Sequence, residues 1–395
     1  MYTEKTKNNF SLTSSFAFVL LSLLFSCQEK PSEYSALEYR GGKDIRISAF
    51  SKTDTLIIDA GPTSLEGKWL IDRGKLLFID QHAVGVRAYD MQGNFMARYI
   101  TRGQGPNEML TPALASTTDG NGNLIMFDGT WMILSYDSNY QMTSERYRFL
   151  SDLNLKEENW TQLLHKPNPE INYMYEYHYS VNRVKVVDSI LFMPIITEHV
   201  TYNGYEISRG NAKKFWRNTY TFMSIDIKNK ITGNLFGAYP PIYRRHNIPV
   251  FASYDFDTDT ENRAMYISFM ADSLIYVRDL ASGNLLYSFG CAANGISKSY
   301  PSTSTFDEYE SEYKNYRKRY GYYTQLVKIN DYLFRVYKRE RDAGYGLQVY
   351  HNALLIGDID LIDSIDIIGE HDGFFYGVLP VDIDNESFKI LKFVL

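Results

Sequence analysis

Short apolar segments separated by turn residues run along most of the 395-residue chain. Within residues 75–100, apolar stretches end at Asp80 and at Asp90, and a third stretch follows the second turn. Residues 122–149 repeat this order of stretches and turns. Runs of this length, bounded by Gly, Asn and Asp, are typical of β-strands. The 33 Tyr and 23 Phe residues also favour strands, so the pattern predicts an all-β fold.

Weaker copies of the same unit extend the repeat along the chain. The turns fall near residues 90, 137, 226, 279, 351 and 384, at spacings of 47, 89, 53, 72 and 33 residues. Because a four-stranded propeller blade takes about 40–50 residues, six turns predict a six-bladed β-propeller of four-stranded antiparallel blades. The wide spacings then contain a blade plus an insertion, and the last blade lacks a strand. That strand can come from residues 44–59, since joining both ends of the chain removes exposed strand edges.

One insertion has the pattern of a helix. Thr305 and Glu308 fit a capping box, acids precede bases along the segment, and Gly321 follows as a stop. We expect one helical insertion near 305–320, docked on the propeller by its tyrosines or acting as a lid that binds a partner. Four tyrosines recur at steps of four, three and four, on one helix face: Tyr309, Tyr313, Tyr316 and Tyr320.

A Gly-rich stretch, RGQGPNE, follows the first repeat at residues 102–108. It lacks the third glycine of a dinucleotide-binding loop, where Glu108 stands, and it lacks the Gly-Lys-Ser/Thr end of a P-loop. We therefore interpret it as the crossing between the first two blades. Gly103 and Gly105 would permit sharp backbone turns there, and Pro106 would stiffen the segment.

The amino terminus has the features of an export signal. Lys5 and Lys7 precede a ten-residue apolar run, Phe16–Phe25. This run is too short for a membrane-spanning helix and fits the apolar region of a secretory signal. The run ends in Leu-Phe-Ser-Cys at Cys27, which resembles a bacterial lipobox, whose cysteine is acylated; an ordinary cleaved signal is the alternative. The expected segments are a signal peptide, 1–26, a lipidated tether, 27–43, and the propeller, 44–395.

These features together resemble the six-bladed, TolB-like β-propeller lipoproteins of Bacteroides and its relatives. The likeness is strongest over residues 70–140, where Tyr-Asp-x-x-Gly is followed by a strand and Arg-Gly-x-Gly-Pro-x-Glu. The resemblance implies a propeller fold and an outer-membrane lipoprotein, facing the periplasm or the cell exterior, and says little about activity. The matching residues are Asp80, Tyr89, Asp90, Gly93, Gly103, Gly105, Pro106, Glu108, Asp119, Gly122, Asn123 and Asp128.

No motif in the sequence defines a reaction, a metal site or a cofactor. The acidic segments DGNGN (119–123) and DFDTDTE (255–261) lack the Gly and Glu of an EF-hand, so we interpret both as polar hairpin turns. A looser calcium site in DFDTDTE stays open. The chain has no Gly-x-Ser-x-Gly elbow and no His-x-x-x-His pair. Cys291 has no disulfide partner if Cys27 carries lipid, and we expect it to be a buried apolar side chain.

The densest basic cluster outside the predicted helix is Arg244, Arg245 and His246. We expect it in a loop between blades, and with Trp216 it forms our candidate ligand-binding site. Arg binds carboxylates through two hydrogen bonds, so such a loop could hold an anionic sugar or peptide. A solvated loop is the alternative.

The net charge of −6, without a long basic run, gives no support to nucleic-acid binding. We expect a lipid-anchored envelope propeller that binds a glycan, a peptide or an envelope protein through its loop face or central funnel. One alternative is a lyase or hydrolase acting on polysaccharide or peptide in that funnel. Another is a subunit of an envelope assembly that docks through the 305–321 helix.

The substitution Cys27→Ala is expected to move the protein from the membrane fraction to the soluble fraction, because a chain without acyl groups has no lipid to insert into the bilayer. Cell fractionation and acyl labelling measure this effect. The matched control, Cys291→Ala, should keep both the label and the membrane attachment. If the Cys27→Ala protein stays acylated and membrane-bound, the lipobox interpretation is wrong.

Overall fold

A computed structural model describes most of the chain. Cys27 and the expected signal peptide lie outside the described residues. Residues Leu37–Leu395 form one compact unit. The described residues are 32–395, apart from 144–145, 149–156, 198 and 208–210.

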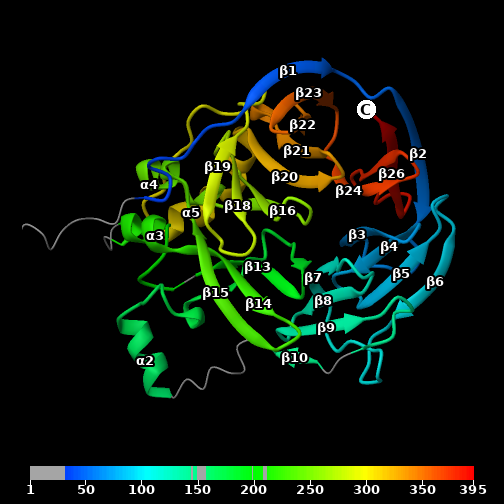
Figure 1. Ribbon diagram of the computed structural model, residues 1–395, viewed down its shortest axis with the longest axis horizontal. Helices are drawn as coiled ribbons and strands as arrows, with labels where there is room; N and C mark the ends of the chain where they lie inside the picture. Colours follow the sequence, from blue (N-terminus) through cyan, green and yellow to red (C-terminus); the bar gives the residue numbers. More distant parts are fainter. Residues whose placement is uncertain (1–31, 144–145, 149–156, 198, 208–210) are drawn as a thin grey trace, which may run out of the picture. The chain divides into compact units, whose positions relative to one another are not determined.

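Six β-sheets make up the unit, and the first three follow one another along the chain (Figure 1). Blade 1 contains β3 (Gly67–Asp72), β4 (Lys75–Asp80), β5 (Gly85–Tyr89) and β6 (Phe95–Ile100). Blade 2 contains β7 (Ala113–Thr118), β8 (Leu124–Asp128), β9 (Met132–Tyr136) and β10 (Tyr147–Arg148). Blade 3 contains β11 (Glu176–Tyr177), β12 (Lys185–Val187), β13 (Ile190–Ile196), β14 (Tyr220–Asp226) and β15 (Ile231–Ala238).

The remaining sheets include the two strands from the amino-terminal region. Blade 4 contains β16 (Tyr254–Asp259), β17 (Ala264–Phe269), β18 (Ile275–Asp279) and β19 (Leu285–Phe289). Blade 5 contains β20 (Tyr322–Ile329), β21 (Tyr332–Lys338), β22 (Tyr345–His351), β23 (Leu354–Leu361) and β1 (Gly42–Ile47). Blade 6 contains β24 (Asp366–His371), β25 (Phe374–Val378), β26 (Ser387–Val394) and β2 (Lys52–Asp59).

Apart from β1, which joins blade 5 in parallel, the strands of each blade are antiparallel, and the first strand lies nearest the centre of the ring (Figure 1). In blade 3 this inner position is divided between two short strands, because β11 and β12 both pair with β13 at different registers. The six-bladed, four-stranded architecture expected from the sequence is confirmed. Each of the six turns used to count repeats belongs to a different blade.

The ring closes through the amino-terminal strand β2. It pairs antiparallel with β26 over its whole length, from Lys52–Val394 to Asp59–Ser387, and so supplies the fourth strand of blade 6. The strand β1 instead runs parallel to β23 and adds a fifth strand to blade 5. Residues 44–59 therefore contribute to two blades. The chain already contacts the ring before β1, since the N–H of Ser288 donates to the carbonyl of Glu38 at 2.9 Å.

The hydrophobic core lies between neighbouring blades. One cluster joins blades 1 and 2, and others join blades 4 and 5, blades 5 and 6, and blades 6 and 1. In the last of these, the ring of Trp69 meets that of Phe388 edge-on at 5.1 Å between centroids. Because both faces of each sheet are covered, the second and third strands are buried almost throughout, as in the β8 sequence LIMFD.

The connections at the two ends of the blades differ in length. First-to-second and third-to-fourth strand turns are mostly short and lie at one end, which we name the turn side. Second-to-third strand connections and blade-to-blade crossings lie at the other end, the loop side, because successive antiparallel strands reverse direction. All helices in the described residues belong to loop-side connections.

Aspartates fix many of these turns. Asp90 Oδ1 accepts the backbone N–H groups of Gln92 and Asn94 at 2.9 and 2.8 Å. Asp137 accepts those of Asn139 and Gln141 at 2.8 and 2.9 Å. Such Asx turns replace backbone hydrogen bonds that the strands cannot supply. The repeated Asp of the sequence pattern is thus a turn-forming residue.

The predicted helix is present as α5 (Phe306–Arg319). Thr305 Oγ1 accepts the N–H of Glu308 at 3.2 Å, while the Glu308 carboxylate accepts the N–H of Ser304 at 2.7 Å. Gly321 follows, as expected, but for another reason: it has no positive φ, and a Cβ there would overlap the carbonyl oxygen of Gly295. The tyrosine face of α5 is half-buried.

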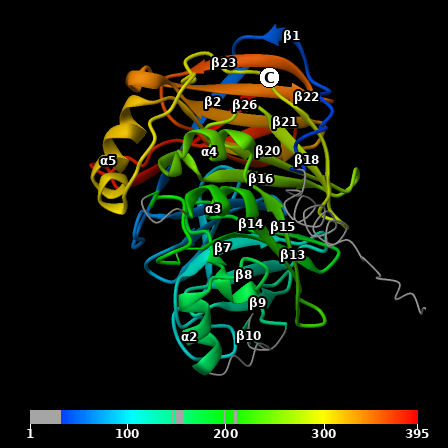
Figure 2. The same ribbon diagram turned by 90° about the vertical axis from the view of Figure 1, so that its left-hand side faces the viewer.

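The sequence predicts a single helical insertion, whereas the structure has further short helices. These are α2 (Glu157–His165), α3 (Ala212–Asn218), α4 (Pro241–His246) and the 3₁₀ turns η1 (Asn172–Met174), η2 (Pro249–Phe251) and η3 (Glu340–Asp342). Most are too short for a periodic pattern to be visible. Helices α3, α4 and α5 lie on the side of the ring turned toward the viewer in Figure 2. No helix in the described part of the chain has the length and apolar character to cross a membrane.

The RGQGPNE stretch lies between β6 and β7, at the crossing from blade 1 to blade 2. Gly103 and Gly105 do not have positive φ, so backbone freedom is not their role. A Cβ on Gly103 would overlap the Glu108 carboxylate, which folds back and accepts the N–H of Gly105 at 2.7 Å. The glycines therefore make room for an acid that closes the turn, and Pro106 lies within it.

The substitution Ile58→Ala in β2 should lower the free energy of unfolding by about 2–5 kcal/mol, because it removes a fully buried side chain from the closing strand. The matched control is its neighbour Ile57→Ala, which is 69% exposed on the other face of β2 and should change stability by less than about 0.5 kcal/mol. Urea denaturation of both variants measures the difference. Equal stabilities would contradict closure of the ring by β2.

Candidate functional site

Ion pairs occupy much of the central channel. Arg183, in the gap between β11 and β12, lies beside two acids of β16: its Nε is 3.5 Å from Asp255 Oδ1 and its Nη1 is 3.8 Å from Asp257 Oδ2. Lys185 Nζ is 2.7 Å from Asp257 Oδ1. Arg183 also donates to the carbonyl of Leu326 in β20 at 2.6 Å. Cations of blade 3 thus bind anions of blade 4 and the backbone of blade 5.

The two acids make backbone hydrogen bonds as well. Asp255 accepts the N–H of Leu326 at 2.8 Å, and Asp257 accepts that of Lys328 at 3.0 Å. Burial raises the pKa of the Asp255 carboxyl, and Arg183 opposes that rise. The space left among these side chains is about 80 Å³. Because the charges are paired and hydrogen-bonded, we assign this network to holding blades 3, 4 and 5 together.

The interpretation of DFDTDTE as a hairpin turn was wrong. Its first five residues belong to β16, the innermost strand of blade 4, and only the last two lie in a turn. Alternating acids are compatible with a strand here because the channel side of the sheet supplies cations. The segment DGNGN lies in the turn between β7 and β8. Within the described ranges, no group of three His, Cys, Asp or Glu side chains is placed to hold a metal ion.

The structure places Trp216 beside the residues that flank the predicted basic cluster, with its ring centroid 5.5 Å from that of Tyr243. Arg244, Arg245 and His246 end the short helix α4, where the sequence predicted a loop; Arg245 and His246 are exposed. Trp216 lies in α3, is 2% exposed, and donates from Nε1 to Asn247 Oδ1 at 2.7 Å. It lines a loop-side cavity to which the three basic residues do not contribute.

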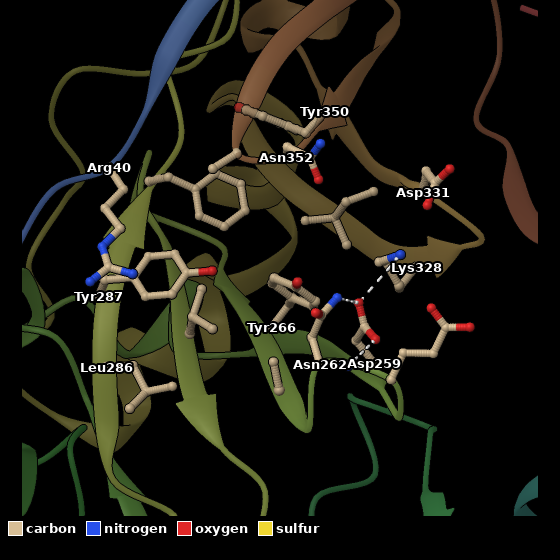
Figure 3. Close-up of a pocket in the computed structure, with 16 residues that line it drawn as sticks. Arg40, Asp259, Asn262, Tyr266, Leu286, Tyr287, Lys328, Asp331, Tyr350 and Asn352 are labelled. Atoms are coloured by element: carbon tan, nitrogen blue, oxygen red, sulfur yellow. Dashed lines mark hydrogen bonds and ion pairs between the residues drawn. The ribbon is translucent and has the colours of Figure 1, made fainter.

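A larger cavity, of about 470 Å³, lies between blades 4 and 5 on the turn side (Figure 3). This volume is within the range of small-molecule sites. The β16–β17, β20–β21 and β22–β23 turns contribute polar side chains to it, and strands β17 and β19 contribute aromatic ones. Arg40 reaches it from the segment before β1, with its guanidinium 4.4 Å above the ring centroid of Tyr287.

Two phenols and several polar groups of this cavity are available to a ligand. The hydroxyls of Tyr266 and Tyr287 have no hydrogen-bond partner among the described residues, and burial raises the pKa of both, so they remain protonated donors. Asp331, Glu261 and Asn352 are exposed and likewise make no side-chain hydrogen bond or ion pair within the described part of the chain. Figure 3 shows Tyr266, Tyr287, Asp331 and Asn352 around one space.

The charged side chains around the cavity give it a negative electrostatic potential. Lys328 lies 3.4 Å from Asp259, which also accepts from Asn262 Nδ2 at 3.0 Å (Figure 3). Arg40 is likewise paired, with Glu38 at 2.7 Å. Asp331 and Glu261 have no counter-charge in the described residues. The cavity therefore suits a ligand with many hydroxyl or amine donors better than an anion.

No sequence motif marks this cavity. Its polar residues lie in short turns that look like ordinary strand connections, including the turn near Asn352 that served to count repeats. The repeat pattern could have indicated the cavity, because turns at the same position of consecutive blades are neighbours in a propeller. The aromatic residues of β17 and β19 could not be distinguished from core residues, since both kinds alternate along strands.

Comparisons with known proteins support the fold. No protein-family model and no curated protein matches the chain. Among solved structures, a member of the DUF4221 family from Bacteroides vulgatus has a TM-score of 0.65 at 13% identity, over 87% of this chain and 97% of its own. A Bacteroides fragilis protein, described as inferred to be exported, has a TM-score of 0.51 at 12% identity, over 90% of this chain and 98% of its own. This chain is a six-bladed β-propeller, and at such identities the likeness concerns the fold alone.

The substitution Arg183→Met should lower the free energy of unfolding by about 3–5 kcal/mol, because it leaves the buried Asp255 without its paired cation and removes one of the two cations beside Asp257. The matched control, Arg263→Met, removes an exposed pair with Asp188, whose side chains are 54% and 70% exposed. Its effect should be at most about 1 kcal/mol. Urea denaturation compares the two variants, and similar losses would show that the channel pairs have no special structural role.

Proposed function

We propose that the protein is a lipid-anchored envelope β-propeller that binds a neutral glycan in the turn-side cavity between blades 4 and 5. The observation that carries the proposal is the combination of aromatic rings with carboxylate and amide groups that have no partner in the described chain. Sugar rings have apolar C–H faces that pack on aromatic rings. Their hydroxyls donate to carboxylates and accept from amides and phenols.

The excess of acid in the cavity supports a neutral glycan over an acidic one. The lining acids are Asp259, Glu261 and Asp331, against Arg40 and Lys328, and both cations already have partners. A uronate or sulfate would face two carboxylates without counter-charge. Rejection of such ligands follows from like-charge repulsion.

The envelope location rests on separate support. The amino-terminal apolar run and Cys27 fit a lipoprotein signal, and one structural neighbour is described as inferred to be exported. We also propose that the protein is related to the TolB-like lipoproteins. Proteins of that group have the same six-bladed propeller fold, and the Cys27→Ala substitution tests the lipid anchor.

An enzyme in the central funnel has less support. Most glycoside hydrolases use two carboxylates, one of which exchanges a proton with the substrate. Asp255 and Asp257 are instead engaged by Arg183, Lys185 and backbone N–H groups. A binding role therefore agrees better with the arrangement of charged groups.

A glycan array probed with the purified full-length protein should show binding to neutral oligosaccharides and little binding to uronate-containing or sulfated ones. For the neutral glycan found, isothermal titration calorimetry should show that Tyr287→Leu and Asp331→Ala each weaken binding by about tenfold or more, because they remove a stacking surface and a charged acceptor. Melting temperature should change little for Asp331→Ala, since this side chain is exposed.

The matched control is Asp384→Ala, an exposed acid of the β25–β26 connection in blade 6. It should leave affinity unchanged. Binding that is confined to acidic glycans, or that tolerates both cavity substitutions, would exclude the cavity between blades 4 and 5 as the glycan site.

A further inference from the structure

A second cavity, on the loop side, contains buried polar atoms without partners. It measures about 100 Å³ and is lined by residues of the β11–β12 gap, α3, η2 and α5. The interruption of the inner strand of blade 3 places His178 in its wall. Helices α3 and α5 lie on the side shown in Figure 2. Gly204 allows close packing on this wall, because a Cβ there would overlap the indole ring of Trp216.

Arg317 brings a positive charge to this cavity from the last turns of α5. Its guanidinium lies 4.7 Å from the ring centroid of Tyr322, 5.3 Å from that of Tyr313 and 5.6 Å from that of Phe251. Nη2 donates to the Tyr313 hydroxyl at 3.2 Å, whereas Nε is buried without a hydrogen-bond partner. Within the described residues, no carboxylate pairs with Arg317. Aromatic rings hold the guanidinium in place but do not neutralise its charge.

Two further residues that line this cavity have buried polar atoms. Within the described chain, His178 Nε2 and Ser253 Oγ have no hydrogen-bond partner, and each residue is 5% exposed. Burial, assisted by Arg317, lowers the pKa of His178 to about 4, so the imidazole is neutral at pH 7. With its proton on Nε2 it is a donor. Leaving a buried polar atom unsatisfied costs about 1–3 kcal/mol.

We propose that this loop-side cavity binds the carboxylate group of a small organic acid, through Arg317, Ser253 and His178. All three side chains can donate, and a carboxylate has only acceptor sites. Its negative charge would neutralise a guanidinium that lacks a counter-ion in the described chain.

The size and walls of the cavity define the rest of the ligand. The volume has room for several water molecules and hence for a carboxylate with a few attached atoms. Trp216, Tyr239 and Tyr309 line it, so a flat or ring-shaped acid would contact aromatic surface. Tyr179 also lines the cavity and is 52% exposed, which leaves the bound acid a route to solvent. This site lies at the opposite end of the blades from the proposed glycan site and is independent of it.

Titration calorimetry of the purified full-length protein with acetate and benzoate tests the proposal, with acetamide and benzyl alcohol as neutral matches. At least one carboxylate should bind and its neutral match should not. Benzoate binding indicates an aromatic acid, and binding of acetate alone indicates a small aliphatic acid. Arg317→Met should weaken the binding by about tenfold or more, and Ser253→Ala should weaken it several-fold.

The double variant Arg244→Ala with Arg245→Ala is the matched control, because it removes two cations of the loop side that do not line the cavity. Its affinity should equal that of the unmodified protein. If no carboxylate binds, water satisfies the three atoms and the proposal is overturned. Should Arg317→Met fail to fold, Ser253→Ala decides: unchanged affinity in that variant would overturn the proposal as well.

Discussion

Neighbouring blades bury their apolar faces against each other, and this face-to-face packing determines where every other kind of residue can lie. Each sheet has two faces to cover, so the second and third strands are buried almost throughout and mostly apolar. A polar side chain inside a blade needs a partner there, as Arg335 of β21 shows: it is fully buried and donates to Ser268 Oγ at 2.7 Å. Other polar side chains lie at the two ends of the strands and along the inner edge. The channel, the turn side and the loop side are therefore the places where chemistry-bearing residues gather. Closure by β2 is a condition of this packing, because an open ring would leave the blade 6–blade 1 cluster exposed.

The polar regions differ in how well their charges are matched. In the channel, Arg183 and Lys185 meet Asp255 and Asp257, and backbone N–H groups complete the network. On the turn side, acids outnumber bases and several groups have no partner in the described chain. On the loop side, no carboxylate of the described chain pairs with Arg317, and its buried Nε has no hydrogen-bond partner there. Matched charges fit a structural role, whereas unmatched ones at a cavity fit a ligand of complementary charge.

Local signals in the sequence were reliable where the local chain alone determines conformation. The aspartates that start turns, the capping residues of α5 and the repeat of short strands are of this kind, and they led to the propeller. The sequence misled where a side chain's role depends on a distant segment. DFDTDTE reads as a turn, yet it is a strand because Arg183, some seventy residues earlier, neutralises its acids. Gly103 reads as a hinge, yet it makes room for Glu108.

The sequence by itself determined the fold class, the number of blades and the position of the long helix, because periodicity and turn chemistry act over a few residues. Only the tertiary structure decided which residues form a site. Tyr287 comes from strand β19, and Asp331 and Asn352 come from the β20–β21 and β22–β23 turns. They lie around one cavity because blades 4 and 5 are neighbours. His178 and Arg317 likewise meet only because an interrupted inner strand and an inserted helix lie at the same end of the ring. Contacts between blades are long-range in sequence, so no local pattern encodes them.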